Sequence, residues 1–151
     1  MRGSVIKNTC LFLVGFCSYI TIEVVFRGYT FPLMGVCGGI AIVILDKINS
    51  KISWDTDILL QGSIGAIIIT LMELIVGELS LAGLVPVMWD YSMVPFNYHG
   101  IICLPFTAAW FFLSIAAIVL ADAINYYTFD ELPPPYYKCC GKVVFQFRKR
   151  V

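Results

Sequence analysis

The chain has little charge and almost no histidine. Only 13% of its 151 residues are Asp, Glu, Lys or Arg, and His99 is the single histidine. A soluble domain carries about 25% charged residues. Hydrophobic residues make up 60% of the chain, and the mean hydropathy is +0.87. This composition excludes an ordinary soluble domain and indicates one compact membrane-embedded unit.

Several motifs that mark catalysis or nucleotide binding do not occur. The sequence contains neither GxxxxGKS/T nor GxGxxG, and neither GxSxG nor HExxH. These are the common signatures of phosphate-binding loops, hydrolases and zinc proteases. A basic stripe with interleaved aromatic residues, which would suggest a nucleic-acid partner, does not occur either. We therefore expect no enzyme activity, no cofactor and no nucleic-acid partner.

The six cysteines do not form a CxxC pair, and His99 is far from any two of them. This spacing predicts no metal site. Cys139 and Cys140 lie close to basic residues near the C-terminus, where two interpretations stay open. They are either reduced thiols beside the membrane or sites of S-acylation.

Four apolar stretches are long enough to cross a bilayer, which takes about 20 residues. Backbone groups in lipid must pair within their own segment, so each stretch predicts a helix. The sequence thus predicts an all-α polytopic membrane protein with four transmembrane helices. A transmembrane domain over residues 1–128 would precede a proline-rich, then basic, loose cytosolic tail over residues 129–151. The predicted spans cover about residues 9–26, 29–48, 58–81 and 100–126.

The positions of Lys and Arg predict the orientation. If both termini are cytoplasmic, every basic residue except Arg27 lies on the inner side. Cytoplasmic segments carry an excess of Lys and Arg, so this asymmetry favours cytoplasmic termini. We expect a multi-pass protein of the cytoplasmic membrane in contact with the lipid bilayer.

Acidic residues inside the apolar stretches are the strongest functional signal, because an ionisable group within a membrane is costly. Glu73 lies about fifteen residues into the third predicted span, with no base nearby in sequence. Apolar surroundings disfavour the charged form of a carboxyl group. Glu73 is therefore either a site for a proton or cation, or a structural group paired with Asn97, Arg27 or a tyrosine.

Two further acids lie closer to the predicted membrane surfaces. Glu23 and Arg27 are four residues apart and share one helix face, as a gate or as an interfacial ion pair. Asp122 lies near the cytoplasmic end of the fourth span, where Lys47 or Lys51 is its expected partner.

The external segment over residues 82–99 is unusually rich in aromatic and polar residues. We expect part of it to cover Glu73 from outside. The predicted polar site, for an ion or another substrate, consists of Glu73, Glu23, Arg27, Trp89, Asp90 and Asn97.

Small residues recur at four-residue spacing in three of the predicted spans. Gly35 and Gly39 form a GxxxG pair in the second span. Gly62 with Ala66, and Ala117 with Ala121, repeat this spacing in the third and fourth spans. Such faces let helices approach closely. They form either the interior of one bundle or a seam between copies in a homo-oligomer.

Most of the chain resembles a known family. The resemblance rests on the run Thr70–Gly77, the sequence Trp89–Ser92, the spacing of Pro95, Asn97 and Gly100, and Trp110. Phe26–Gly28 and Pro135–Lys138 support it. The chain resembles the ABC-transporter type IV, permease-like integral membrane proteins of Firmicutes. The resemblance implies a permease-like subunit whose ATPase is a separate chain, and it implies no catalytic residues.

These observations lead to a first hypothesis and two alternatives. The first is a small transporter or permease-like subunit with Glu73 as its intramembrane polar site, completed by oligomerisation because four helices are few for a permease. The second is a non-transporting membrane adaptor or scaffold, whose tail recruits another protein. The third is a small oligomeric ion channel or holin-like pore.

Overall fold

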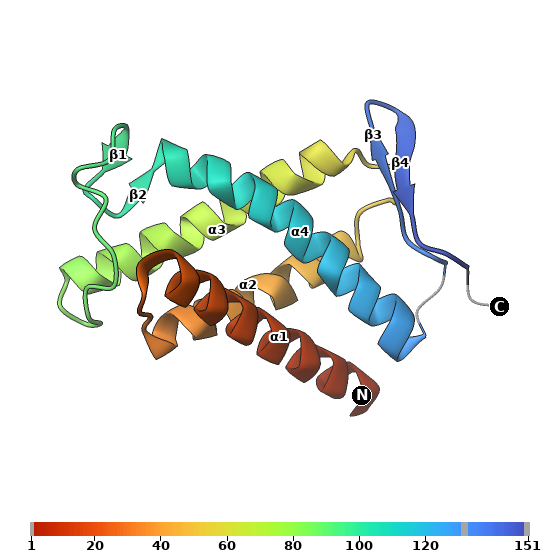
Figure 1. Ribbon diagram of the computed structural model, residues 1–151, viewed down its shortest axis with the longest axis horizontal. Helices are drawn as coiled ribbons and strands as arrows, with labels where there is room; N and C mark the ends of the chain where they lie inside the picture. The colour runs from red at the N-terminus through yellow and green to blue at the C-terminus, as the bar shows by residue number, and fades with distance from the viewer. Residues whose placement is uncertain (1, 131–132, 150–151) are drawn as a thin grey trace.

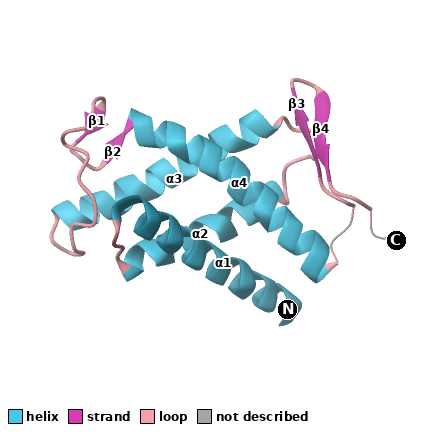
Figure 2. Ribbon diagram, in the orientation of Figure 1, coloured by secondary structure: helices cyan, strands magenta, loops and turns pink. Residues whose placement is uncertain are grey.

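The computed structural model describes residues 2–130 and 133–149. Its architecture is mostly helical, but the predicted all-α fold lacks the two small antiparallel hairpins at opposite ends of the helix bundle (Figures 1 and 2). The helices are α1 (Arg2–Arg27), α2 (Pro32–Asn49), α3 (Ile58–Leu81) and α4 (Leu104–Phe129). The hairpins pair β1 (Asn97–Tyr98) with β2 (Ile102–Cys103), and β3 (Tyr136–Cys139) with β4 (Lys142–Gln146).

Three helices are long and apolar enough to cross a membrane: α1 from Gly3 onward, α3 and α4. The second predicted span, over residues 29–48, corresponds to α2, which does not belong to this set. Its 18 residues extend about 27 Å at 1.5 Å per residue, against a hydrocarbon core of about 30 Å. Asp46 and Lys47 in its last turns shorten the apolar stretch further.

The helix boundaries depart most from the predicted spans at the starts of α1 and α4. Helix α1 begins at Arg2, so it includes the polar segment that precedes the apolar run. Helix α4 begins at Leu104 rather than at residue 100, because Cys103 pairs with Asn97 in the β1–β2 hairpin. A proline follows in its first turn, where a missing N–H costs no hydrogen bond.

The helices pack chiefly as two pairs, α1 with α2 and α3 with α4. Glycines allow the close approach within the first pair. A Cβ added at Gly38 would lie 2.5 Å from Cβ of Tyr19, and one added at Gly39 would lie 2.6 Å from the ring of Phe12. The Gly35–Gly39 pair therefore packs against α1 of the same chain, which is the intramolecular interpretation of the GxxxG spacing.

The C-terminal segment is not the loose extension predicted from its prolines. Strands β3 and β4 form a hairpin, and Tyr137 is only 2% exposed. Tyr137 packs with Leu45, Ile58 and Ile118, one from each of three helices. Gly141 with a φ of 77° makes the turn. Aromatic and β-branched residues favour strands on both sides of this turn, and this signal outweighs the preceding prolines.

Candidate polar site between the helix pairs

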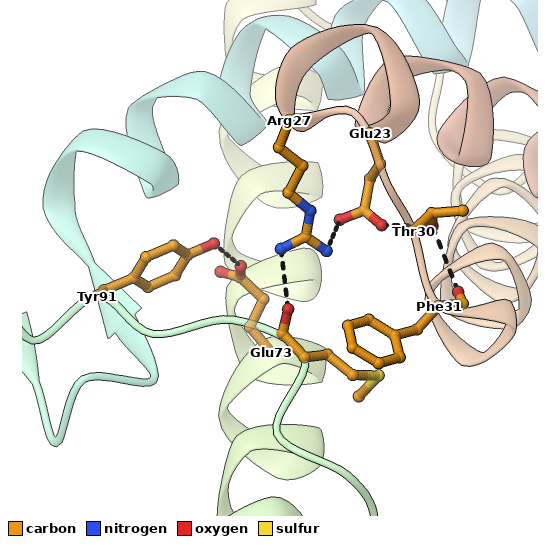
Figure 3. Close-up of polar contacts among 7 residues, drawn as sticks. Glu23, Arg27, Thr30, Phe31, Glu73 and Tyr91 are labelled. Atoms are coloured by element: carbon orange, nitrogen blue, oxygen red, sulfur yellow. Dashed lines mark hydrogen bonds and ion pairs between the residues drawn. The ribbon is translucent and has the colours of Figure 1, made fainter.

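The carboxylate of Glu73 accepts hydrogen bonds from two neutral side chains that lie outside α3. Its side chain projects from the middle of α3 and is only 8% exposed. The hydroxyl of Tyr91 donates to Oε1 over 2.9 Å, as Figure 3 shows, and Nε1 of Trp110 donates to Oε2 over 2.7 Å. Both carboxylate oxygens therefore have a partner, one from the external segment and one from α4.

Glu23 and Arg27 form the predicted pair on α1, with 2.7 Å between Oε1 and Nη2. Nη1 of Arg27 donates to the carbonyl oxygen of Met88 over 2.8 Å, and Thr30 donates to Oε2 of Glu23 over 2.6 Å. These contacts tie the end of α1 and the α1–α2 turn to the external segment (Figure 3). The ion pair thus fastens the end of the first helix pair that lies next to the segment over residues 82–99.

Asp90 and Asn97 make their hydrogen bonds within the external segment. Oδ1 of Asp90 accepts from the backbone N–H of Ser92 over 2.8 Å, and this hydrogen bond lowers the pKa of Asp90. Nδ2 of Asn97 donates to the carbonyl of Val94 over 2.7 Å, while its Oδ1 accepts from the N–H of Gly100. Both side chains therefore shape the turn that presents Tyr91, and neither is a hydrogen-bond partner of Glu73.

The predicted site left out Tyr91 and Trp110, although both lie in the stretches that carry the family resemblance. Tyr91 is buried and stacks on Phe106 with 4.5 Å between ring centroids. Burial, followed by the charge of Glu73, raises the pKa of the Tyr91 hydroxyl. The hydroxyl therefore stays protonated and serves as a donor. Sequence spacing could not reveal these contacts, because the donors lie 18 and 37 residues from Glu73.

A cavity of about 190 Å³ lies beside Glu73, between the two helix pairs. Its wall is almost entirely apolar and draws residues from all four helices and from the external segment. Tyr19, Glu73, Trp89 and Trp110 form the aromatic and acidic part of the wall. The rings of Tyr19 and Trp110 are 6.0 Å apart, and Nε1 of Trp89 donates to the carbonyl of Ile101. The indole of Trp89 is thereby fixed at the cavity.

A second set of buried polar residues lies near the other end of the bundle. Asp46 on α2 accepts a hydrogen bond from Asn125 on α4, and Lys7 Nζ lies 3.6 Å from its Oδ2. Asp122 accepts from the hydroxyl of Tyr137 over 2.7 Å. The sequence predicted Lys47 or Lys51 as its partner, whereas this hydrogen bond comes from Tyr137 of the docked β3–β4 hairpin.

Comparison with known proteins shows the family of the chain. The family model described as "Putative ABC-transporter type IV" matches residues 5–147. No curated protein and no solved structure matches the chain. The match extends over all four helices and both hairpins.

Proposed function

The chain belongs to the ABC-transporter type IV family, and from this premise we propose that it is a small permease-like subunit of the cytoplasmic membrane. In this proposal Glu73 is the intramembrane polar site, and the ATPase is a separate chain. The observation that carries the proposal is the position of the Glu73 carboxylate in the wall of the cavity between the two helix pairs.

The surroundings of Glu73 favour a cation over an anion. The two hydrogen-bond donors to its carboxylate, Tyr91 and Trp110, are neutral. The nearby guanidinium of Arg27 binds Glu23 and the Met88 carbonyl instead. A cation in the cavity would meet this carboxylate as well as aromatic rings, whose faces attract positive charge. The site therefore suits a proton or a small monocation with an apolar body.

The arrangement of the helices supports movement between two halves. The closest packing joins α1 to α2 and α3 to α4, whereas packing between the two pairs is less extensive and leaves the cavity beside Glu73. Many transporters alternate access by rocking one bundle against another around a central site. The cavity is smaller than the roughly 300–1,000 Å³ of typical ligand pockets. We propose that a second copy or the ATPase-bearing partner completes the pathway.

Flux through reconstituted protein tests the role of Glu73. Proteoliposomes holding the full chain would be assayed for uptake of radiolabelled benzyltrimethylammonium and for proton flux reported by an internal pH dye. We expect the flux into vesicles with wild-type protein to exceed the flux into empty vesicles. Glu73→Gln should reduce this flux at least about tenfold, equivalent to about 1.4 kcal/mol. Glu78→Gln is the matched control, because Glu78 is an exposed acid on the same helix.

Two results would overturn this proposal. One is equal flux for wild type and Glu73→Gln, both folded. The other is no flux of either probe by wild type in the presence of its ATPase partner. The channel or pore hypothesis is tested separately, by the mass of the particle in nanodiscs and by its ion conductance. A defined oligomer with ungated ion conductance would support that hypothesis instead.

One observation favours the adaptor hypothesis as a second candidate. All five residues of β4 are exposed, and its outer edge offers unpaired backbone groups to another strand. A photocrosslinking residue at Val144 would trap a defined protein in cells if this edge recruits a partner. The adaptor hypothesis also expects Glu73→Gln to affect only stability, whereas the transport proposal expects it to affect flux.

A further inference from the structure

Three metal-ligating side chains lie together far from Glu73, at the end of the bundle where β3 and β4 are found (Figure 1). They are Asp57, Cys139 and Cys140. One carboxylate oxygen and the two Sγ atoms all lie within 4.8 Å of one another. Asp57 precedes α3, whereas both cysteines lie at the turn of the C-terminal hairpin, so the fold joins residues up to 83 positions apart.

Backbone and side-chain contacts hold these ligands in place independently of any metal. Asp57 caps α3 by accepting from the N–H of Leu59 over 2.9 Å, and its Oδ2 accepts from the N–H of Cys140. An isolated parallel bridge joins Asp57 to Lys138. The hairpin is therefore held against the start of α3, and the ligand atoms lie close together before a metal binds.

A second set of contacts reinforces the same junction. The hydroxyl of Tyr136 donates to Oδ1 of Asp55 over 2.8 Å, and Lys138 forms an ion pair with the same carboxylate. The ring of Tyr136 also lies beside Trp54. The loop before α3 and the first strand of the hairpin are thus attached at several points, which limits the entropy lost on binding a metal.

We propose that Asp57, Cys139 and Cys140 bind one thiophilic divalent cation of the Zn²⁺ or Cd²⁺ class. Zinc prefers four ligands in a tetrahedron, with about 2.3 Å to sulfur and about 2.0–2.2 Å to carboxylate oxygen. These lengths place neighbouring ligand atoms about 3.5–4 Å apart, so the three groups, now within 4.8 Å of one another, need to close by about 1.3 Å at most.

The chemistry of the donor set also selects the metal class. Two thiolates favour soft or borderline metals over Mg²⁺ and Ca²⁺, which prefer oxygen. Each thiol releases its proton to solvent when it binds, leaving two thiolates and one carboxylate on the ion. Cys140 is exposed, so water can supply the fourth ligand. The proposal does not depend on the transport role of Glu73.

Cd²⁺ titration of the full, reduced chain in nanodiscs tests this site, with thiolate-to-metal charge-transfer absorption as the signal and Zn²⁺ as competitor. We expect one ion per chain. Cys139→Ser and Cys140→Ser should each weaken binding by at least about 10- to 100-fold. Asp57→Asn should also weaken binding while keeping the helix cap, because Asn caps as well as Asp. Cys17→Ser, which alters an exposed cysteine of α1, should bind as wild type does.

Three results would overturn the proposal. The first is unchanged affinity in the double variant Cys139→Ser/Cys140→Ser. The second is wild-type affinity in Asp57→Asn, which would leave only the two thiols as ligands. The third is an intact mass of the native chain that shows the pair acylated, or joined as a disulfide that mild reductant does not open.

Discussion

Trp110 on α4 donates a 2.7 Å hydrogen bond from its indole N–H to Oε2 of Glu73 on α3. The bond joins two helices in the interior of the bundle, since Trp110 and Glu73 are both buried. It also fixes the carboxylate in the cavity wall. The same contact thus contributes both to packing and to the geometry of the candidate site.

Replacing Trp110 by Phe is expected to destabilise the protein by about 1–3 kcal/mol, because a buried carboxylate oxygen loses its partner. In a double-mutant cycle with Glu73→Gln, the two changes should couple by about 0.5–3 kcal/mol. SDS-titration unfolding of the four proteins measures this coupling. Phe112→Leu, at an exposed ring of the same helix, serves as control. Additive effects would show that the hydrogen bond contributes little.

The tight contact of α1 with α2 predicts a strong effect at Gly38. Gly38→Ala places a methyl group 2.5 Å from Cβ of Tyr19. Separating the helices should cost about 1–3 kcal/mol of unfolding free energy. Gly3→Ala is a matched control on α1, because nothing lies within 4 Å of the added atom. That change should be neutral or stabilise by up to about 1 kcal/mol. Equal effects of the two variants would contradict the observed packing.

Alkaline pH should weaken the fold through Tyr91. Its pKa is raised in the folded state by burial and by Glu73, so the unfolded chain loses this proton first. An unfolded tyrosine ionises at about pH 10. The stabilisation is therefore fully present below pH 10 and is lost as pH rises above it. Measured between pH 8 and 11, unfolding free energy should fall less steeply in Tyr91→Phe than in wild type. Parallel slopes would refute this linkage.

The C-terminal hairpin should contribute to the stability of the whole bundle. Tyr137→Ala removes a ring packed among three helices and should cost about 3–5 kcal/mol, by analogy with other aromatic truncations in cores. Tyr137→Phe keeps the ring but deprives Asp122 of a donor, for a smaller loss of about 1–3 kcal/mol. Thermal unfolding in detergent, followed by circular dichroism, compares them. A Tyr137→Ala variant as stable as wild type would mean that the hairpin is dispensable.

Structural features that follow from a local property of the chain agree best with their predictions. The predicted span over residues 58–81 agrees with α3, Ile58–Leu81, because apolar length is a property of consecutive residues. The Glu23–Arg27 pair was found for the same reason, since four-residue spacing places both on one helix face. The start of α4 was misplaced, because pairing of Asn97 with Cys103 depends on a strand partner.

By itself, the sequence determined that this protein is mostly helical and apolar, with acids placed where a membrane makes them costly. Composition and short-range spacing decide those properties. Only the tertiary structure decided that Glu73 receives Tyr91 and Trp110, that Tyr137 enters the core, and that Asp57 lies beside Cys139 and Cys140. Those contacts join residues distant in sequence, and their energy exists only once the helices and hairpins have packed.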